Sequence, residues 1–193
     1  MGWLTGIPLP HGRSVTKEID ALITHSSDGA YTQRVLRSAL VAMSEYYAAV
    51  ECINAYGHRQ VWAAMFLVEV KRDRFGKTWG YKDMDESMGP AYTRCPLAIL
   101  DLLTEPLNDQ AAIWRACCRD HHARRARITG LKPGMRIRLA APMRFSNGRD
   151  LDVFDIVRGL NGRGIAFMNG GVRYAPSTSA LARVAFTVEA SHG

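Results

Sequence analysis

The stretch YKDMDESMGP, residues 81–90, gathers carboxylates at Asp83, Asp85 and Glu86. Carboxylate oxygens are the ligands that Mg²⁺ and Ca²⁺ prefer, and paired carboxylates divide acid and base roles when burial separates their pKa values. Asp83 and Glu86 are spaced so that they would share one face of a helical turn. These acids are the candidate catalytic residues. The stretch lacks the third oxygen ligand and the glycine of a calcium loop, so we expect no metal and no cofactor.

The same stretch also fits a purely structural turn. Asp83 is a suitable cap for a short helical turn, the acids after it favour the positive end of that turn, and Gly89-Pro90 ends it. Tyr81 then packs inward and the segment forms a rigid ledge, so loss of the Glu86 charge would leave stability nearly unchanged. The candidate contacts of this ledge with a partner are Tyr81, Lys82 and Glu86.

Positive charge is concentrated in residues 115–144. The chain has a formal net charge of +7, and Asp120 is the only acid in this segment. Clustered arginine and lysine side chains bind phosphate groups. Alternatively, these arginines complement the negative end of a helix and pair with nearby acids. The candidate nucleic-acid-binding residues are Arg115, Arg119, Arg124, Arg125, Arg127, Lys132, Arg136 and Arg138.

The elements that would position these groups begin with a predicted hairpin. Residues 45–53 alternate in polarity and residues 61–71 are apolar on both faces, which predicts two antiparallel strands. Residues 34–43 fit a helix and a strand equally well. Together with the helices described next, these strands make residues 1–128 an α+β domain.

Apolar residues at helical spacing predict helices over 14–29, with Thr16 as the cap, over 95–105 and over 108–128. The buried stripe of the last helix is expected at Ala112, Ile113, Ala116 and Cys117. The predicted core residues are Val50, Phe66, Val68, Leu100, Ile113 and Trp114.

After the loop at residues 129–134 the pattern changes to short strands with turn signals. Asn147-Gly148 and Asn161-Gly162 are typical of hairpin turns, and residues 182–190 read as a last strand. We predict a small SH3-like or OB-like β-barrel domain over 132–193. This fold analogy carries no function.

The composition is typical of a cytoplasmic globular protein. No apolar run approaches the length of a membrane span, and the first residues do not form a signal peptide. The cysteines are Cys52, Cys95, Cys117 and Cys118. None forms a CxxC pair, so we expect reduced thiols.

Several motifs together resemble an uncharacterised protein family of bacteria, phages and plasmids. These motifs are MGW at the start, EYYAAV (45–50), YKDMDESMGP (81–90), CPLAILDLLTE (95–105) and WRACC (114–118). The family is classed as a domain of unknown function. The resemblance implies a bacterial setting, often a mobile element, and supplies neither a reaction nor a catalytic residue.

Three functions are compatible with these observations. The first is a non-enzymatic accessory protein of bacteria or mobile elements that contacts DNA or RNA through the basic patch at 115–144. The second is a protein-binding inhibitor of a host defence system, for which a host defence protein is the partner. The third is an enzyme with an acidic site at 81–94. We favour the first because the excess of positive charge is local.

Overall fold

The computed structural model describes residues 2–25, 31–74, 76–159 and 164–189. The chain divides into two compact units, Met1–His122 and Ala123–Gly193. The boundary falls inside a helix that continues from one unit into the other, whereas the sequence suggested the loop at 129–134. Each unit has its own hydrophobic core and is described by itself.

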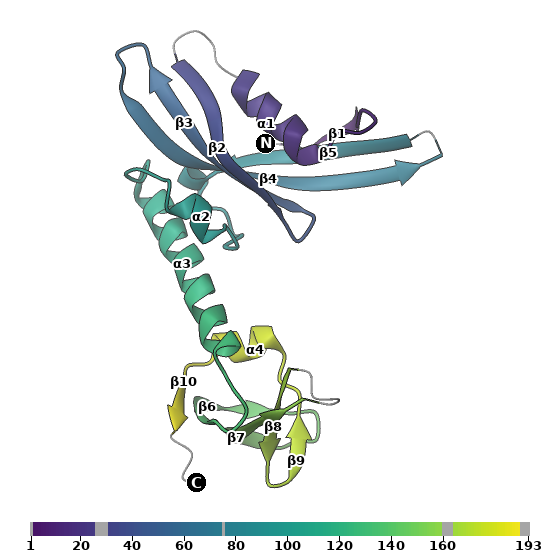
Figure 1. The fold of residues 1–193 in the computed structure, drawn as a ribbon, viewed down its shortest axis with the longest axis vertical. Coiled ribbons are helices and arrows are strands. Elements are labelled where there is room, and N and C mark those ends of the chain that lie inside the picture. The colour runs from purple at the N-terminus through teal and green to yellow at the C-terminus, as the bar shows by residue number, and fades with distance from the viewer. Residues whose placement is uncertain (1, 26–30, 75, 160–163, 190–193) are drawn as a thin grey trace. The chain divides into compact units, whose positions relative to one another are not determined.

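The Met1–His122 unit is built on a five-stranded antiparallel sheet with the strand order β1-β5-β4-β3-β2 (Figure 1). The β3–β4 hairpin corresponds to the predicted strands, and of residues 34–43, 34–41 prove to be extended and Ala42 and Met43 lie in the turn that follows. The sequence analysis missed β1 and β5, which pair with each other across a long separation along the chain. The strands are β1 (Leu4–Pro8), β2 (Tyr31–Val41), β3 (Glu45–Asn54), β4 (Arg59–Asp73) and β5 (Gly76–Asp85).

Helices cover both faces of this sheet. α1 (Val15–His25) packs through Ile19 against one face of β3, while α2 (Leu97–Leu100) and the first part of α3 (Asp109–Thr129) pack on the other (Figure 1). Neighbouring residues of β3 therefore enter two different cores, with Tyr46 on the α1 side and Tyr47 on the α3 side. This double burial explains why the EYYAAV run is apolar on both faces.

Two of the predicted helices differ from the observed helices at one end. The cap of α1 is Ser14, whose Oγ accepts from the Lys17 amide at 3.3 Å, and not Thr16. The helix predicted over 95–105 stops after one turn, at Leu100. It stops because Thr104 exchanges backbone and side-chain hydrogen bonds with Val61 of β4, at 3.0–3.2 Å, and these bonds need an extended chain.

The rotational setting of α3 differs from the predicted one. Its buried residues within the Met1–His122 unit are Ala111, Trp114 and Cys118, so the predicted stripe is wrong and Ile113 is 57% exposed. The bulky Trp114 ring packs into the core, and its Nε1 donates to the Tyr92 carbonyl at 2.9 Å. The remaining core predictions are confirmed: Val50, Phe66, Val68, Leu100 and Trp114 are all buried.

The Ala123–Gly193 unit contains a second five-stranded antiparallel sheet, with the order β10-β6-β7-β8-β9. The chain is thus α+β, but the pairings among the described residues do not join β9 to β10 into a closed barrel. The region predicted as a last strand is only partly extended, because Ser177 caps a short helix before it. The elements are β6 (Arg136–Arg144), β7 (Asp150–Arg158), β8 (Ile165–Asn169), β9 (Val172–Tyr174), α4 (Thr178–Arg183) and β10 (Phe186–Glu189).

One of the two predicted hairpin turns of this unit lies among the described residues. Gly148 adopts a positive φ of 80° and donates its amide to the Phe145 carbonyl at 2.9 Å, which fits the predicted hairpin turn. The Asn161-Gly162 turn lies outside the described residues. No helix in the described part of the chain has the combined length and hydropathy needed to cross a bilayer.

The β2–β3 hairpin closes through a turn of unusual composition. Ala42 and Met43 have φ values of 50° and 62°, and the Ser44 amide donates to the Val41 carbonyl. These are the left-handed angles of a type I′ turn, which asparagine and glycine adopt far more readily than alanine and methionine. The turn therefore holds conformational strain at a fully solvated position.

Relieving this strain should stabilise the protein. We expect Ala42→Asn combined with Met43→Gly to raise the free energy of unfolding by about 1–2 kcal/mol, because both residues then favour a positive φ. Urea denaturation measures this change. The matched control, Met43→Ala, removes the same exposed side chain but keeps the strain, and should leave stability nearly unchanged. A stabilisation of equal size in the control would show that strain is not the cause.

The setting of α3 predicts opposite reactivities for its adjacent cysteines. Cys117 is exposed, whereas Cys118 is buried and burial raises the pKa of its thiol to about 12. Burial also raises the pKa of the Cys95 thiol. We expect iodoacetamide at mildly alkaline pH to modify Cys117 in the native protein and to reach Cys95 and Cys118 only after denaturation, as read by peptide mapping. Faster labelling of Cys118 than of Cys117 would contradict the observed setting of the helix.

Candidate functional site

The acidic stretch is the end of a strand followed by a short 3-10 turn, η1 (Glu86–Met88). Asp83 still belongs to β5 and lies opposite Phe66, so it does not cap the turn. The cap is Asp85, whose Oδ1 accepts from the Ser87 amide at 2.7 Å. The predicted cap was two residues early because β5 stays paired with β4 as far as Asp85. Gly89 ends the turn at a φ of 59°, as predicted.

Glu86 does not project from this turn toward a partner. Its side chain is fully buried and forms a bidentate ion pair with Arg115, with both Nε–Oε2 and Nη2–Oε1 at 2.6 Å. Arg115 also donates to the Thr104 carbonyl. One candidate from the acidic stretch and one from the basic patch thus neutralise each other inside the Met1–His122 unit. Neither side chain is presented to solvent for catalysis or for phosphate binding.

Two more buried glutamates of the sheet are also paired with arginines. Glu45 accepts from Arg94 and from the Tyr47 hydroxyl, which lies at 2.8 Å. Glu51 lies between Arg34 and Arg59, and their hydrogen bonds hold the pKa of its carboxyl below the usual value. Arginine pairing is therefore the general way in which this unit accommodates buried carboxylates.

The other two residues of the predicted ledge lie in β5. Tyr81 is half-buried, and its ring centroid lies 5.5 Å from that of Phe66 and 5.4 Å from that of Trp79. Burial raises the pKa of the Tyr81 hydroxyl. Lys82 points to the opposite face of the strand, where it is half-buried across from Leu67. Tyr81 packs inward as expected, and it belongs to the α1 side of the core.

Most of the predicted basic patch is engaged within the protein. In the Met1–His122 unit, Arg119 pairs with Asp101 at 2.9 Å, in addition to Arg115, which pairs with Glu86. In the Ala123–Gly193 unit, Arg127 lies over the Phe186 ring at 5.5 Å. Arg125 and Lys132 are exposed, whereas Arg124 is half-buried and makes an interaction.

The two remaining patch residues are the β6 arginines, which are paired on the sheet surface. Arg136 binds Asp155 through two hydrogen bonds, at 2.7 and 3.1 Å. Arg138 binds Glu189 at 2.7 Å and Asp152 at 3.3 Å. The local acids therefore offset much of the charge excess that the sequence showed along 115–144.

A second group of basic side chains surrounds a cavity of about 450 Å³ in the Met1–His122 unit. The cavity lies between the loop before α1 and the end of the β4–β5 hairpin, and its polar side chains are His11, Arg13, Arg72 and Lys77. We call these four residues the hairpin cation cluster. The Leu9 amide holds the two segments together by donating to the Lys77 carbonyl at 2.9 Å.

The strand register forces two of these cations together. Arg72 of β4 and Lys77 of β5 are direct cross-strand partners, an arrangement of like charges that destabilises a sheet. On the other side, the turn Pro10–Arg13 is closed by an amide-to-carbonyl bond of 3.0 Å, with Gly12 at a φ of 79°. The sequence analysis missed this cluster, although the run KRDRFGK (71–77) and the turn signal PHGR (10–13) were both visible.

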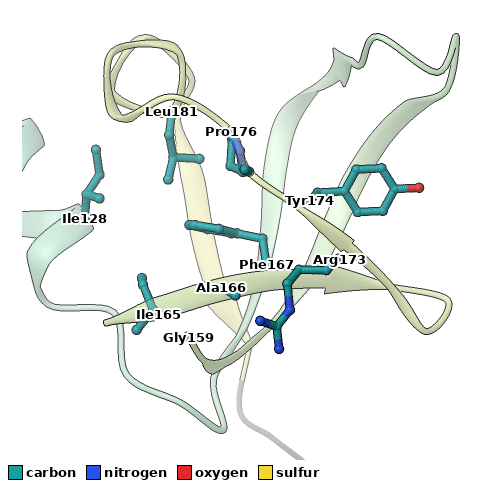
Figure 2. Close-up of a pocket in the computed structure, with 10 residues that line it drawn as sticks. Ile128, Gly159, Ile165, Ala166, Phe167, Arg173, Tyr174, Pro176 and Leu181 are labelled. Carbon is teal, nitrogen blue, oxygen red and sulfur yellow. The ribbon is translucent and has the colours of Figure 1, made fainter. Parts of the chain in front are cut away.

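A separate, apolar cavity of about 680 Å³ lies in the Ala123–Gly193 unit (Figure 2). Phe167 and Leu181 face one another near Pro176, and Ile128 and Ile165 complete that side of the wall (Figure 2). The Tyr174 ring points away from these side chains and stacks edge-on against Phe145 instead.

Comparison with protein families agrees with the resemblance to an uncharacterised family. Residues 105–181 match the model of a family described as Domain of unknown function (DUF6927). The matched segment contains α3 and most of the Ala123–Gly193 unit, including the apolar cavity. Neither the curated proteins nor the solved structures gave a match to the chain.

The buried ion pair predicts a large effect of a small change. Glu86→Gln should lower the free energy of unfolding by about 3–5 kcal/mol, because it leaves the Arg115 guanidinium buried without a counter-charge. This reverses the expectation drawn from the sequence. Adding Arg115→Met should recover part of the loss, since no uncompensated charge then remains. The control Glu105→Gln, at an exposed glutamate, should change stability by less than about 0.5 kcal/mol. Equal stabilities for Glu86→Gln and the control would rule out a structural role for the pair.

Proposed function

We propose that the protein is a non-enzymatic accessory protein of bacteria or their mobile elements that binds nucleic acid through the hairpin cation cluster. The observation that carries this proposal is the direct cross-strand pairing of Arg72 with Lys77 at the wall of a cavity that Arg13 and His11 also line. A bound phosphate would lie among these basic side chains and neutralise the mutual repulsion of Arg72 and Lys77.

The electrostatics of the cluster favour an anionic ligand. Arg72 and Lys77 are both exposed, and no described acidic side chain forms an ion pair with either of them. Arg13 does pair with Glu18, at 3.2 Å, but its side chain is 59% exposed. Exposed pairs of this kind contribute little stability, so the guanidinium can turn to a phosphate at small cost.

The paired arginines of the original basic patch rank second as a contact surface. SH3-like and OB-like modules bind nucleic acid through a strand face, and β6 would supply Arg136 and Arg138 to such a face. A phosphate would first have to displace Asp155, Asp152 and Glu189 from these side chains. The cluster at Arg72 and Lys77 needs no such displacement.

An enzymatic site among the acids of residues 81–94 has less support. Asp85 is occupied as a cap and Glu86 as the partner of Arg115. Asp83 is exposed on the α1 face of β5, where its neighbour Tyr81 packs into the core. The three carboxylates therefore lie in different local environments and do not point toward one common position.

The proposal predicts opposite effects of one substitution pair on binding and on stability. Arg72→Gln with Lys77→Gln should weaken binding of a short random-sequence oligonucleotide about 10–100-fold and should lower the slope of log K against log salt by about 2. The free protein should at the same time become more stable, by about 0.2–1 kcal/mol, because a like-charge pair is removed. Fluorescence anisotropy over a salt series, with DNA and RNA probes, and urea denaturation give both quantities.

A charge-matched control distinguishes this cluster from the basic patch. Arg125→Gln with Lys132→Gln removes the same net charge from exposed positions of the patch. We expect the control to lower affinity by less than about threefold, through long-range attraction alone. A larger loss in the control than in the Arg72/Lys77 variant would move the contact surface to the patch. Absence of binding by the wild type at low salt would remove nucleic acid as the partner.

A further inference from the structure

The apolar cavity of the Ala123–Gly193 unit arises from the way its sheet ends. β9 pairs with β8 only over Phe167–Asn169, so the first residues of β8, Ile165 and Ala166, have no β9 partner. The chain then leaves β9 through Ala175 and Pro176 and enters α4. The cavity lies in the resulting gap and is produced by the topology, not by one small side chain.

The walls and the size of this cavity suit a small apolar ligand. Ile128 from the end of α3, Ile165 and Phe167 from β8, and Leu181 from α4 supply its apolar surface (Figure 2). Its volume of about 680 Å³ lies within the range of ligand sites, which is roughly 300–1,000 Å³. Filling it would remove apolar surface from water in a unit with a small core.

One charged residue lines the cavity. Arg173 of β9 is exposed, and its guanidinium points toward the side of Gly159 (Figure 2). Among the residues that the structure describes, no acid forms an ion pair with Arg173. Arg136, Arg138 and Arg144 of the same unit all have carboxylate partners. Arg173 differs from these three in having no carboxylate partner among the described residues, and it borders the apolar cavity.

We propose that this cavity binds a small amphiphilic anion, such as a medium-chain carboxylate, whose apolar part fills the cavity and whose anionic group meets Arg173 at its rim. The charge complements the guanidinium, and the apolar part complements the walls. This site is independent of the proposed nucleic-acid contact, since its residues all belong to the Ala123–Gly193 unit.

Displacement of a fluorescent probe tests the site in the full-length chain. Anilinonaphthalene sulfonate, an apolar ring system with one anionic group, serves as the probe, and decanoate and decanol compete for it. The two competitors share one chain length and differ in charge. Decanoate should displace the probe at concentrations about tenfold lower than decanol does, as expected for one charge-assisted hydrogen bond.

Two variants assign the binding to this cavity. Arg173→Gln should weaken decanoate about tenfold and leave decanol unchanged, while the charge-matched Arg149→Gln should change neither. Ala175→Trp places a large ring at the exposed rim and should abolish displacement by both competitors, whereas Ala141→Trp, at an exposed alanine of β6, should not. Thermal unfolding checks that each variant is folded.

Each possible result of these measurements either supports or overturns the proposal. A wild-type preference for decanoate that is lost in Arg173→Gln supports the proposal, even if Ala175→Trp does not fold. Equal displacement by decanoate and decanol, or wild-type affinity for decanoate in Arg173→Gln, overturns it. Failure of the wild type to bind the probe saturably overturns it as well, without bearing on the nucleic-acid result.

Discussion

The ion pair between the buried Glu86 and Arg115 connects three parts of the Met1–His122 unit: the end of β5, α3 and the segment that carries Thr104. A fully buried carboxylate must be neutralised and hydrogen-bonded, and the planar guanidinium does both only in one relative orientation. The end of β5 is thereby fixed against α3. Because Arg115 also binds the Thr104 carbonyl, and Thr104 in turn binds Val61, the same network reaches back to β4. Sheet, connecting segment and helix are consequently held in one register.

Local pattern was sufficient to predict the elements whose burial is simple. The β3–β4 hairpin and the existence of α1 and α3 followed from alternation and helical spacing. The identity of the buried face of α3 did not follow from this spacing. A second apolar stripe lies beside the buried one and consists of Ala112, Ile113, Ala116 and Cys117. Periodicity cannot choose between two adjacent stripes when the choice depends on where a tryptophan fits. β1 was missed because its partner β5 lies far along the chain.

The candidate sites were likewise predictable from the sequence only in part. Residue type indicated correctly that the acids of 83–86 and the arginines of 115–138 were unusual, but their roles depended on which of them met in space. Glu86 and Arg115 belonged to two different hypotheses and satisfy each other. The hairpin cation cluster escaped notice for the opposite reason: its members come from residues 11–13 and 72–77, which only the pairing of β1 with β5 brings together.

That same pairing has a consequence for the order of events in a growing chain. β1 is synthesised long before β5, and closing so large a loop costs entropy that only the finished sheet repays. β1 therefore has no partner strand until the β4–β5 hairpin has been made. The loop carrying His11 and Arg13 docks with it, through the bond from Leu9 to Lys77. A nascent or partly folded chain thus has no assembled cation cluster, and the proposed binding of polyanions at this cluster would require the completed unit.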